Sequence, residues 1–214
     1  MFSVDADAGR PDLVRSALTL EWATLVWVLG EAVVAISAGI GAHSLSLLAF
    51  GADSLIEAFS ACVLLWRLNV ELRAGHAFSA DAERKASRIS GVLLFALAAY
   101  VVASAAWGLW AGEGQAFSRL GLAVTAATIP VMYLLARRKL AIAERISSRA
   151  LRADAMESLT CGWLSFVVLA GLLAQLTLGA WWVDSVTALA IVYFLIREGR
   201  EAWAVEECGC SSCH

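Results

Sequence analysis

Long apolar stretches, each near the length needed to cross a lipid bilayer, alternate with short polar segments along the whole chain. An α-helix rises about 1.5 Å per residue, so roughly 20 apolar residues cross a hydrocarbon core of about 30 Å. The third and fifth stretches are expected to extend as amphipathic helices into the segments before them. The pattern predicts six membrane-spanning helices, at 17–40, 43–68, 89–111, 117–137, 150–178 and 181–203.

The composition also indicates a membrane protein. Hydrophobic residues make up 60% of the 214 residues and charged residues only 16%, whereas a soluble domain carries about 25% charged residues. The net charge of −3 argues against nucleic acid as a partner. We expect an all-α polytopic protein with one transmembrane domain at 17–203, a cytoplasmic N-terminal segment at 1–16 and a cytoplasmic Cys-rich tail at 204–214.

Positive charge is distributed unevenly between the two sides of the predicted helices. Fifteen of the 16 Lys and Arg residues, all except Arg119, lie before the first stretch, at the end of the last, or between the second and third or fourth and fifth. Lys139 is one of them and is assigned to the connection after 117–137. Because cytoplasmic connections are enriched in these residues, we expect an integral protein of the cell (inner) membrane with both termini in the cytoplasm.

Potential metal ligands interrupt two of the apolar stretches. Asp53 and Glu57 stand four residues apart in the second stretch. Glu157 and Cys161 stand four residues apart in the fifth. Residues at this spacing share a helix face, and Asp154 lies on the face of the second pair as an outer group or an extra ligand. Ionisable side chains within a span are costly and therefore indicate function, so these residues predict a metal site.

The two pairs of ligands belong to an internal repeat. An offset of 104 residues aligns Asp53 with Glu157, and it relates the second helix to the fifth, which crosses the bilayer in the opposite direction. Inverted repeats of this kind place transporter sites near the bilayer midplane. Each pair begins about 10 residues, or roughly 15 Å, from one end of its helix, which predicts equal depth. The offset also pairs Ser44, Leu47, Ala49, Ser54 and Leu55 with Ser148, Leu151, Ala153, Ser158 and Leu159.

Three carboxylates and a thiolate form a ligand set suited to a soft divalent ion. Zn²⁺ accepts both oxygen and sulfur ligands at about 2.0–2.3 Å, and the thiol disfavours Mg²⁺ and Ca²⁺. Because the ligands must be deprotonated to bind metal, the site would hold protons when empty and release them on loading. We expect Zn²⁺, or a similar ion such as Cd²⁺ or Co²⁺, as cargo exchanged for protons, with no prosthetic group.

Structural explanations stay open for several of these residues. A hydrogen bond to a neighbouring helix explains Glu31 as well as a functional role does, and Glu21 is expected near the inner interface. Cys161 alone is also consistent with a small buried apolar residue. Cys62 lies five residues past Glu57 and is rotated off its face, which favours a packing role.

The C-terminal tail concentrates soft ligands. Three thiols and an imidazole fall within its last seven residues. Their spacing differs from that of a zinc finger, which favours capture or transfer of a metal over a rigid structural ion, and an incidental tail is the alternative. The four residues are Cys208, Cys210, Cys213 and His214.

The second and fifth stretches resemble helices of the cation diffusion facilitator family of metal/proton antiporters. In the second stretch, two acids stand four apart after a Ser-x-x-Leu-x-Ala segment that begins at Ser44. The counterpart in the fifth runs from Ala150 to Cys161, and Trp182-Val-Asp184 is similar to the family's entry into its last helix. The resemblance covers roughly 15–203 and implies six spans, inward termini and a homodimer.

Departures from the family pattern concern metal choice and domain content. Glu57 stands where the family has Asp, while Glu157 and Cys161 replace its usual His or Asp followed by Asp. No counterpart of the family's C-terminal cytosolic domain is recognised, so we expect a short member without it. We predict a proton-coupled efflux carrier rather than an enzyme. The alternatives are a membrane metal sensor or buffer acting through the tail, and a redox or haem protein, which is disfavoured because only His43 among three histidines lies near a span.

Overall fold

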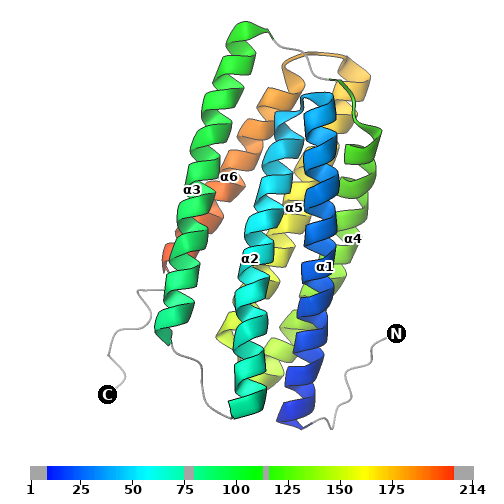
Figure 1. Ribbon diagram of the computed structural model, residues 1–214. Coiled ribbons are helices and arrows are strands. Elements are labelled where there is room, and N and C mark those ends of the chain that lie inside the picture. The colour runs from blue at the N-terminus through cyan, green and yellow to red at the C-terminus, as the bar shows by residue number, and fades with distance from the viewer. Residues whose placement is uncertain (1–8, 75–79, 113–115, 205–214) are drawn as a thin grey trace.

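The computed structural model describes residues 9–74, 80–112 and 116–204, which form long helices joined by short connections (Figure 1). No strand occurs within these ranges, so the prediction of an all-α fold is confirmed. The helices are α1 (Arg10–Ala42), α2 (Leu45–Ala74), α3 (Ala80–Ala111), α4 (Arg119–Ile146), α5 (Arg149–Leu178) and α6 (Val183–Ala204).

The helices have the dimensions and surface of a membrane bundle. Five of the six described helices, α1 to α5, are long and apolar enough to cross a membrane. The sixth has 22 residues and rises about 33 Å, close to the thickness of the hydrocarbon core. Large apolar side chains are exposed on the outward faces, as lipid-facing residues are; on α1 these include Trp22, Val26, Leu29 and Val33. The chain is therefore a polytopic helical membrane protein.

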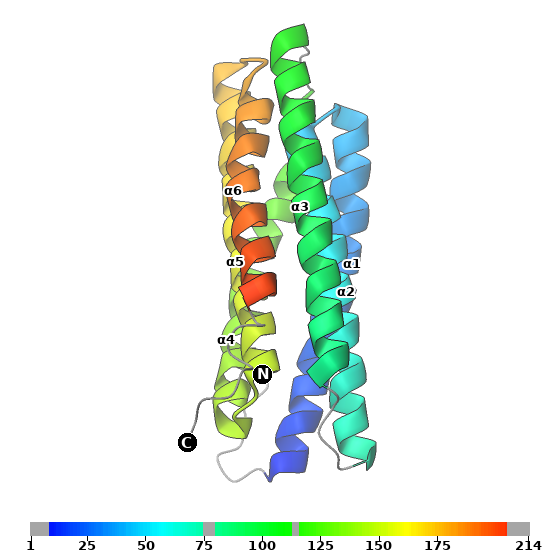
Figure 2. The same ribbon diagram turned by 90° about the vertical axis from the view of Figure 1, so that its left-hand side faces the viewer.

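Four of the helices form one group, and the other two form a pair beside it. Helix α1 packs against α2 and α4, and α5 packs against α4 and α2. Helices α3 and α6 pack against each other and contact the group through α2 and α5, and Figure 2 shows this pair nearest the viewer. A Cβ atom at Gly91 of α3 would lie 2.7 Å from the ring of Trp203 and 3.3 Å from the Gly199 carbonyl oxygen, both on α6, so the glycine favours a close approach of these helices.

Helix α4 continues well beyond the end predicted from the apolar pattern. The prediction ends it at residue 137, whereas the helix runs to Ile146. Its last turns are amphipathic, because Lys139 and Ile142 are buried while Arg137 and Arg145 are exposed. The assignment of Lys139 to a connection is therefore wrong, since its charge sits on the buried stripe of a helix.

The turns at the start of the two repeats have the same backbone geometry. His43 ends α1 and Ser147 ends α4, each in the left-handed conformation with φ of 54° and 53°. The next residue, Ser44 or Ser148, donates its N–H to the carbonyl five residues earlier, at 2.9 Å and 3.0 Å. Each of these serines also accepts the N–H of the residue three positions later, at 3.3 Å in both turns. The offset of 104 residues thus relates two equivalent helical hairpins of opposite direction.

Asp184, the second residue of α6, anchors that helix to the start of α2. Its carboxylate accepts hydrogen bonds from the hydroxyls of Ser44 and Ser46, at 2.6 Å and 2.5 Å, and from the N–H of Leu45 at 2.6 Å. The free N–H groups at a helix start favour a negative partner. Because α2 and α6 run in the same direction from this anchor, equal numbers of residues along them reach similar depths.

Candidate functional site

The two predicted pairs of ligands, one on α2 and one on α5, face each other inside the bundle. Asp53, Glu57 and Cys161 are buried, with exposed fractions of 5%, 3% and 2%, and Glu157 is half-buried. Glu157 interacts electrostatically with both Asp53 and Glu57. Cys161 interacts in the same way with Glu57 and Asp53. The structure therefore brings all four sequence-predicted side chains close enough for their charges to interact. We call this group of side chains the acidic neighbourhood.

The side chains of this neighbourhood do not form a closed ligand shell. Among the described residues, no group of three or more His, Cys, Asp or Glu side chains is arranged to hold a metal ion. One oxygen of Glu57, Oε2, is buried and has no hydrogen-bond partner in the described part of the chain. A buried carboxylate oxygen without a partner is costly. Binding of a cation or a proton at this oxygen would relieve that cost.

A fourth carboxylate, Glu198 of α6, belongs to the same neighbourhood and was not predicted as a site residue. It is half-buried and interacts electrostatically with Asp53, Glu57 and Glu157. Glu57 lies 12 residues after Leu45 and Glu198 lies 14 after Asp184, which puts them about 18 Å and 21 Å below the shared anchor. The signal that could have found Glu198 is its position inside the predicted span 181–203, where ionisable residues indicate function.

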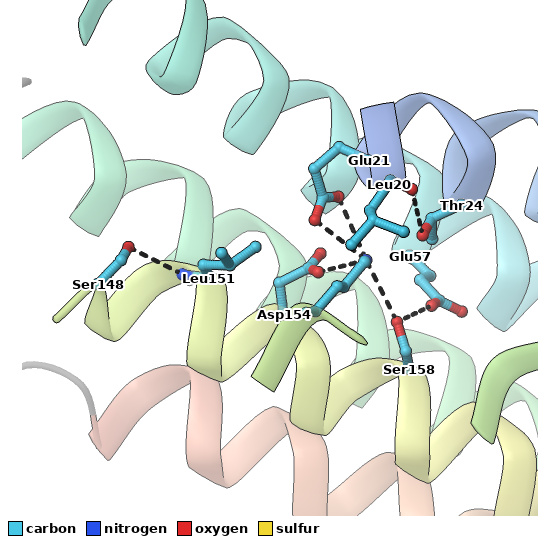
Figure 3. Close-up of polar contacts among 9 residues, drawn as sticks. Leu20, Glu21, Thr24, Glu57, Ser148, Leu151, Asp154 and Ser158 are labelled. Atoms are coloured by element: carbon cyan, nitrogen blue, oxygen red, sulfur yellow. Dashed lines mark hydrogen bonds and ion pairs between the residues drawn. The ribbon is translucent and has the colours of Figure 1, made fainter. Parts of the chain in front are cut away.

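Lys139 lies beside this neighbourhood, toward the C-terminal end of α4 and between two carboxylates from other helices. Its Nζ is 2.5 Å from Asp154 Oδ2 of α5, and 3.1 Å and 3.3 Å from the two carboxylate oxygens of Glu21 on α1. Lys139 and Glu21 are fully buried. Figure 3 shows Glu21, Asp154, Ser158 and Glu57 drawn together by these contacts. We call Glu21, Lys139 and Asp154 the ionic triad.

The ionic triad changes the interpretation of two residues. Glu21 was expected near the inner interface, where it would need no special role, and the structure shows it buried in the bundle and paired with Lys139. Asp154 was predicted to be an outer group of the metal site or an extra ligand, and in the structure its carboxylate faces the Lys139 ammonium. The missed signal is the helical spacing of Met132, Ala136, Lys139 and Ala143, which places the lysine on a buried stripe.

Glu31 of α1 is a further buried acid. It interacts electrostatically with Asp53 and Glu57, and its hydrogen bonds come from neutral donors. Its carboxylate accepts hydrogen bonds from the Trp27 indole at 2.9 Å and the Ser54 hydroxyl at 2.6 Å. The Thr128 hydroxyl and the Cys161 thiol, the latter at 3.7 Å, also donate to it. The donors come from α1, α2, α4 and α5, so Glu31 joins the four helices of the group. Of the two explanations left open for Glu31, these contacts support the structural one.

The remaining cysteines lie outside this neighbourhood or outside the described residues. Cys62 is exposed on α2, and its predicted rotation away from Glu57 agrees with this position. The predicted ligands of the tail fall beyond residue 204, the last one that the structure describes. They are Cys208, Cys210, Cys213 and His214.

Comparison with known proteins places most of the bundle in one family. Residues 22–203 match the model of a cation efflux transmembrane domain. The chain is also similar to transmembrane protein 163 of Xenopus laevis, with 24% identity over 186 residues. That similarity covers 86% of this chain and 65% of the relative. The chain thus spans just under two thirds of the relative's length.

Proposed function

Because the chain belongs to the cation efflux, or cation diffusion facilitator, family, we propose that it exports a divalent transition-metal cation from the cytoplasm in exchange for protons. The proposed cargo is Zn²⁺ or a similar soft ion such as Cd²⁺ or Co²⁺. Asp53, Glu57, Glu157 and Cys161 are the proposed ligands, since oxygen and thiolate donors together suit these ions.

The observation that carries this proposal is the buried Glu57 Oε2 atom, which has no hydrogen-bond partner among the described residues. It lies in a neighbourhood where Asp53 and Glu157 add further negative charge. A divalent cation would satisfy the free oxygen and offset the repulsion between the carboxylates. Closing the ligand shell requires the side chains to rotate toward the ion, because no three of the described ligands are yet arranged around one point.

Exchange for protons follows from the chemistry of the donors. Carboxylates and a thiol bind a metal only when deprotonated. Protons and metal therefore compete for the same oxygen and sulfur atoms, and a proton arriving from outside helps to displace the ion. The proposed direction of export rests on membership of the cation efflux family, and the uneven distribution of Lys and Arg predicts which face is cytoplasmic. The homodimer and the metal-collecting role of the Cys-rich tail stay predictions.

Asp53→Asn tests the proposed site, because it removes one charge and leaves the side-chain volume nearly unchanged. Purified protein in liposomes should accumulate Zn²⁺, Cd²⁺ or Co²⁺ when an outward proton gradient is imposed, with the metal supplied to the cytoplasmic face. We expect uptake by Asp53→Asn to fall to the level of protein-free liposomes. The measurement is the initial uptake rate of each ion, reported by a trapped indicator.

Asp12→Asn is the matched control, because it makes the same change at an exposed residue of the first turn of α1. Its uptake should equal that of the wild type. Uptake by Asp53→Asn at the wild-type rate would contradict the assignment of the site. Wild-type liposomes that accumulate none of the three ions would contradict the proposed function itself.

A further inference from the structure

Lys139 uses all of its donors inside the protein. An ammonium has three N–H groups, and Lys139 directs them to Asp154 at 2.5 Å, to Glu21 at 3.3 Å and to the Ser158 hydroxyl at 3.5 Å. It is the only cationic side chain among the fully buried residues that the structure describes. A buried ion pair is weak evidence for stability by itself, because removing the charges from water is costly. A role in function is therefore worth seeking.

Ser158 connects Lys139 with the proposed cation site. Its hydroxyl donates to Glu57 Oε1 at 3.3 Å, across the interface of α5 and α2. Several buried hydroxyls in these helices donate to the carbonyl four residues earlier, as those of Thr24, Thr125 and Ser165 do. Others, such as those of Ser44 and Ser54, donate to a buried carboxylate of another helix. In the described residues, Ser158 has Lys139 and Glu57 as its hydrogen-bond partners, so it joins an ammonium to a carboxylate.

The direction of these bonds links the ammonium to the orientation of Glu57. A serine hydroxyl has one hydrogen to donate and lone pairs to accept with. The ammonium cannot accept a hydrogen bond, so it takes a lone pair of Ser158 and leaves the O–H for Glu57 Oε1. A bond to Oε1 restricts rotation of the carboxylate, and Oε2 is then the oxygen that has no hydrogen-bond partner among the described residues.

We propose that Lys139 is a positioning residue of the cation site, which acts through Ser158 to hold Glu57 with its Oε2 atom free for the ion. This inference rests on the proposed function and adds a residue that touches no cargo. Asp154 and Glu21 hold the ammonium in place, and their two negative charges keep it from moving onto Glu57. Asp154 is therefore a partner of Lys139 and not a ligand of the cation.

Ser158→Ala in the full chain tests the connection, because it removes the hydroxyl and leaves the ionic triad intact. We expect the KM for Zn²⁺ uptake into liposomes to rise about three- to tenfold, the range that one lost hydrogen bond supplies. The maximal rate should change less, because the lost contact orients a ligand that binds the ion from the start. Ser158→Thr keeps a hydroxyl and should restore the KM.

Ser165→Ala is the matched control, since Ser165 is equally buried on the same helix and its hydroxyl bonds only the backbone of α5 in the described residues. It should leave the KM unchanged. A packing role for Ser158 would make the larger Thr more harmful than Ala, so this order would overturn the inference. An unchanged KM for Ser158→Ala beside active wild type would overturn it as well, while leaving the proposed function in place.

The ammonium itself is tested by Lys139→Met combined with Glu21→Gln and Asp154→Asn, which removes all charges of the ionic triad at once. No charge is left unpaired, so we expect a folded protein in detergent with a raised KM. A wild-type KM in this triple variant would show that Lys139 only joins helices, and would overturn the inference. If the triple variant does not fold, the KM values of Ser158→Ala and Ser158→Thr decide whether the inference holds.

Discussion

Two polar networks join the same four helices at two levels of the bundle, and they differ in how the buried acids are satisfied. Glu31 and Glu21 lie ten residues apart on α1, which is about 15 Å along the helix. In the first, the Glu31 network, neutral donors from α1, α2, α4 and α5 bind the carboxylate of Glu31. In the second, the Lys139 network, Lys139 of α4 pairs with Glu21 and Asp154, and Ser158 continues the network to Glu57 on α2.

The difference predicts how each network responds to damage. Four neutral donors share the task of satisfying Glu31, so the loss of one leaves the others in place. The Lys139 network depends on the Lys139 ammonium, and its loss leaves two carboxylates buried without a counter-charge. Leaving a buried charge unpaired costs more than losing one neutral hydrogen bond. The Lys139 network should therefore be the more sensitive of the two, although both join the same helices.

Lys139→Met should have the largest effect on stability. It keeps the apolar stem of the side chain but leaves Glu21 and Asp154 unpaired, which we expect to lower the free energy of unfolding by about 3–5 kcal/mol. The nine tryptophans of the chain provide a fluorescence signal for thermal unfolding in detergent. Adding Glu21→Gln and Asp154→Asn should restore most of the loss. If Lys139→Met alone were as stable as the wild type, the ammonium would make no net contribution to the free energy of unfolding.

Glu31→Gln should have a smaller effect. The amide oxygen still accepts hydrogen bonds, but the amide nitrogen replaces an acceptor with a donor next to the Ser54 or Thr128 hydroxyl. We expect a loss of about 1–3 kcal/mol, measured by the same unfolding signal. Glu144→Gln is the matched control, because Glu144 is exposed on α4 and should not affect unfolding. No loss in Glu31→Gln would show that one Glu31 oxygen already carries a proton.

Much of the fold could be predicted from the chain because its patterns are local. The apolar stretches gave six helices in nearly the right places, and the repeat found at Ser44 and Ser148 corresponds to two equivalent turns. The C-terminal end of α4 was missed because a charged run after residue 137 resembles a connection. The helix continues there because Lys139 finds two acids on other helices, and those contacts are distant in sequence.

The site shows the same division between local and distant information. A spacing of four residues, as between Asp53 and Glu57, places two side chains on one face of a helix. This follows from helix geometry alone. Glu198 joins them because Asp184 sets the depth of α6 against α2, a contact across about 140 residues of chain. Pairing between helices, unlike spacing within one, cannot be derived from a single sequence by periodicity.

Ser54→Ala and Ser158→Ala separate the two networks with the smallest change, since these serines are counterparts in the repeat. Ser54 donates to Glu31 over 2.6 Å, whereas the bonds of Ser158 to Glu57 and from Lys139 are 3.3 Å and 3.5 Å long. Shorter hydrogen bonds to a carboxylate are the stronger ones. We therefore expect Ser54→Ala to lower the free energy of unfolding by about 1 kcal/mol and Ser158→Ala by less. The order should reverse for the KM of uptake, because only Ser158 contacts a proposed ligand. If the same serine dominated both stability and KM, the two networks would not have separate roles.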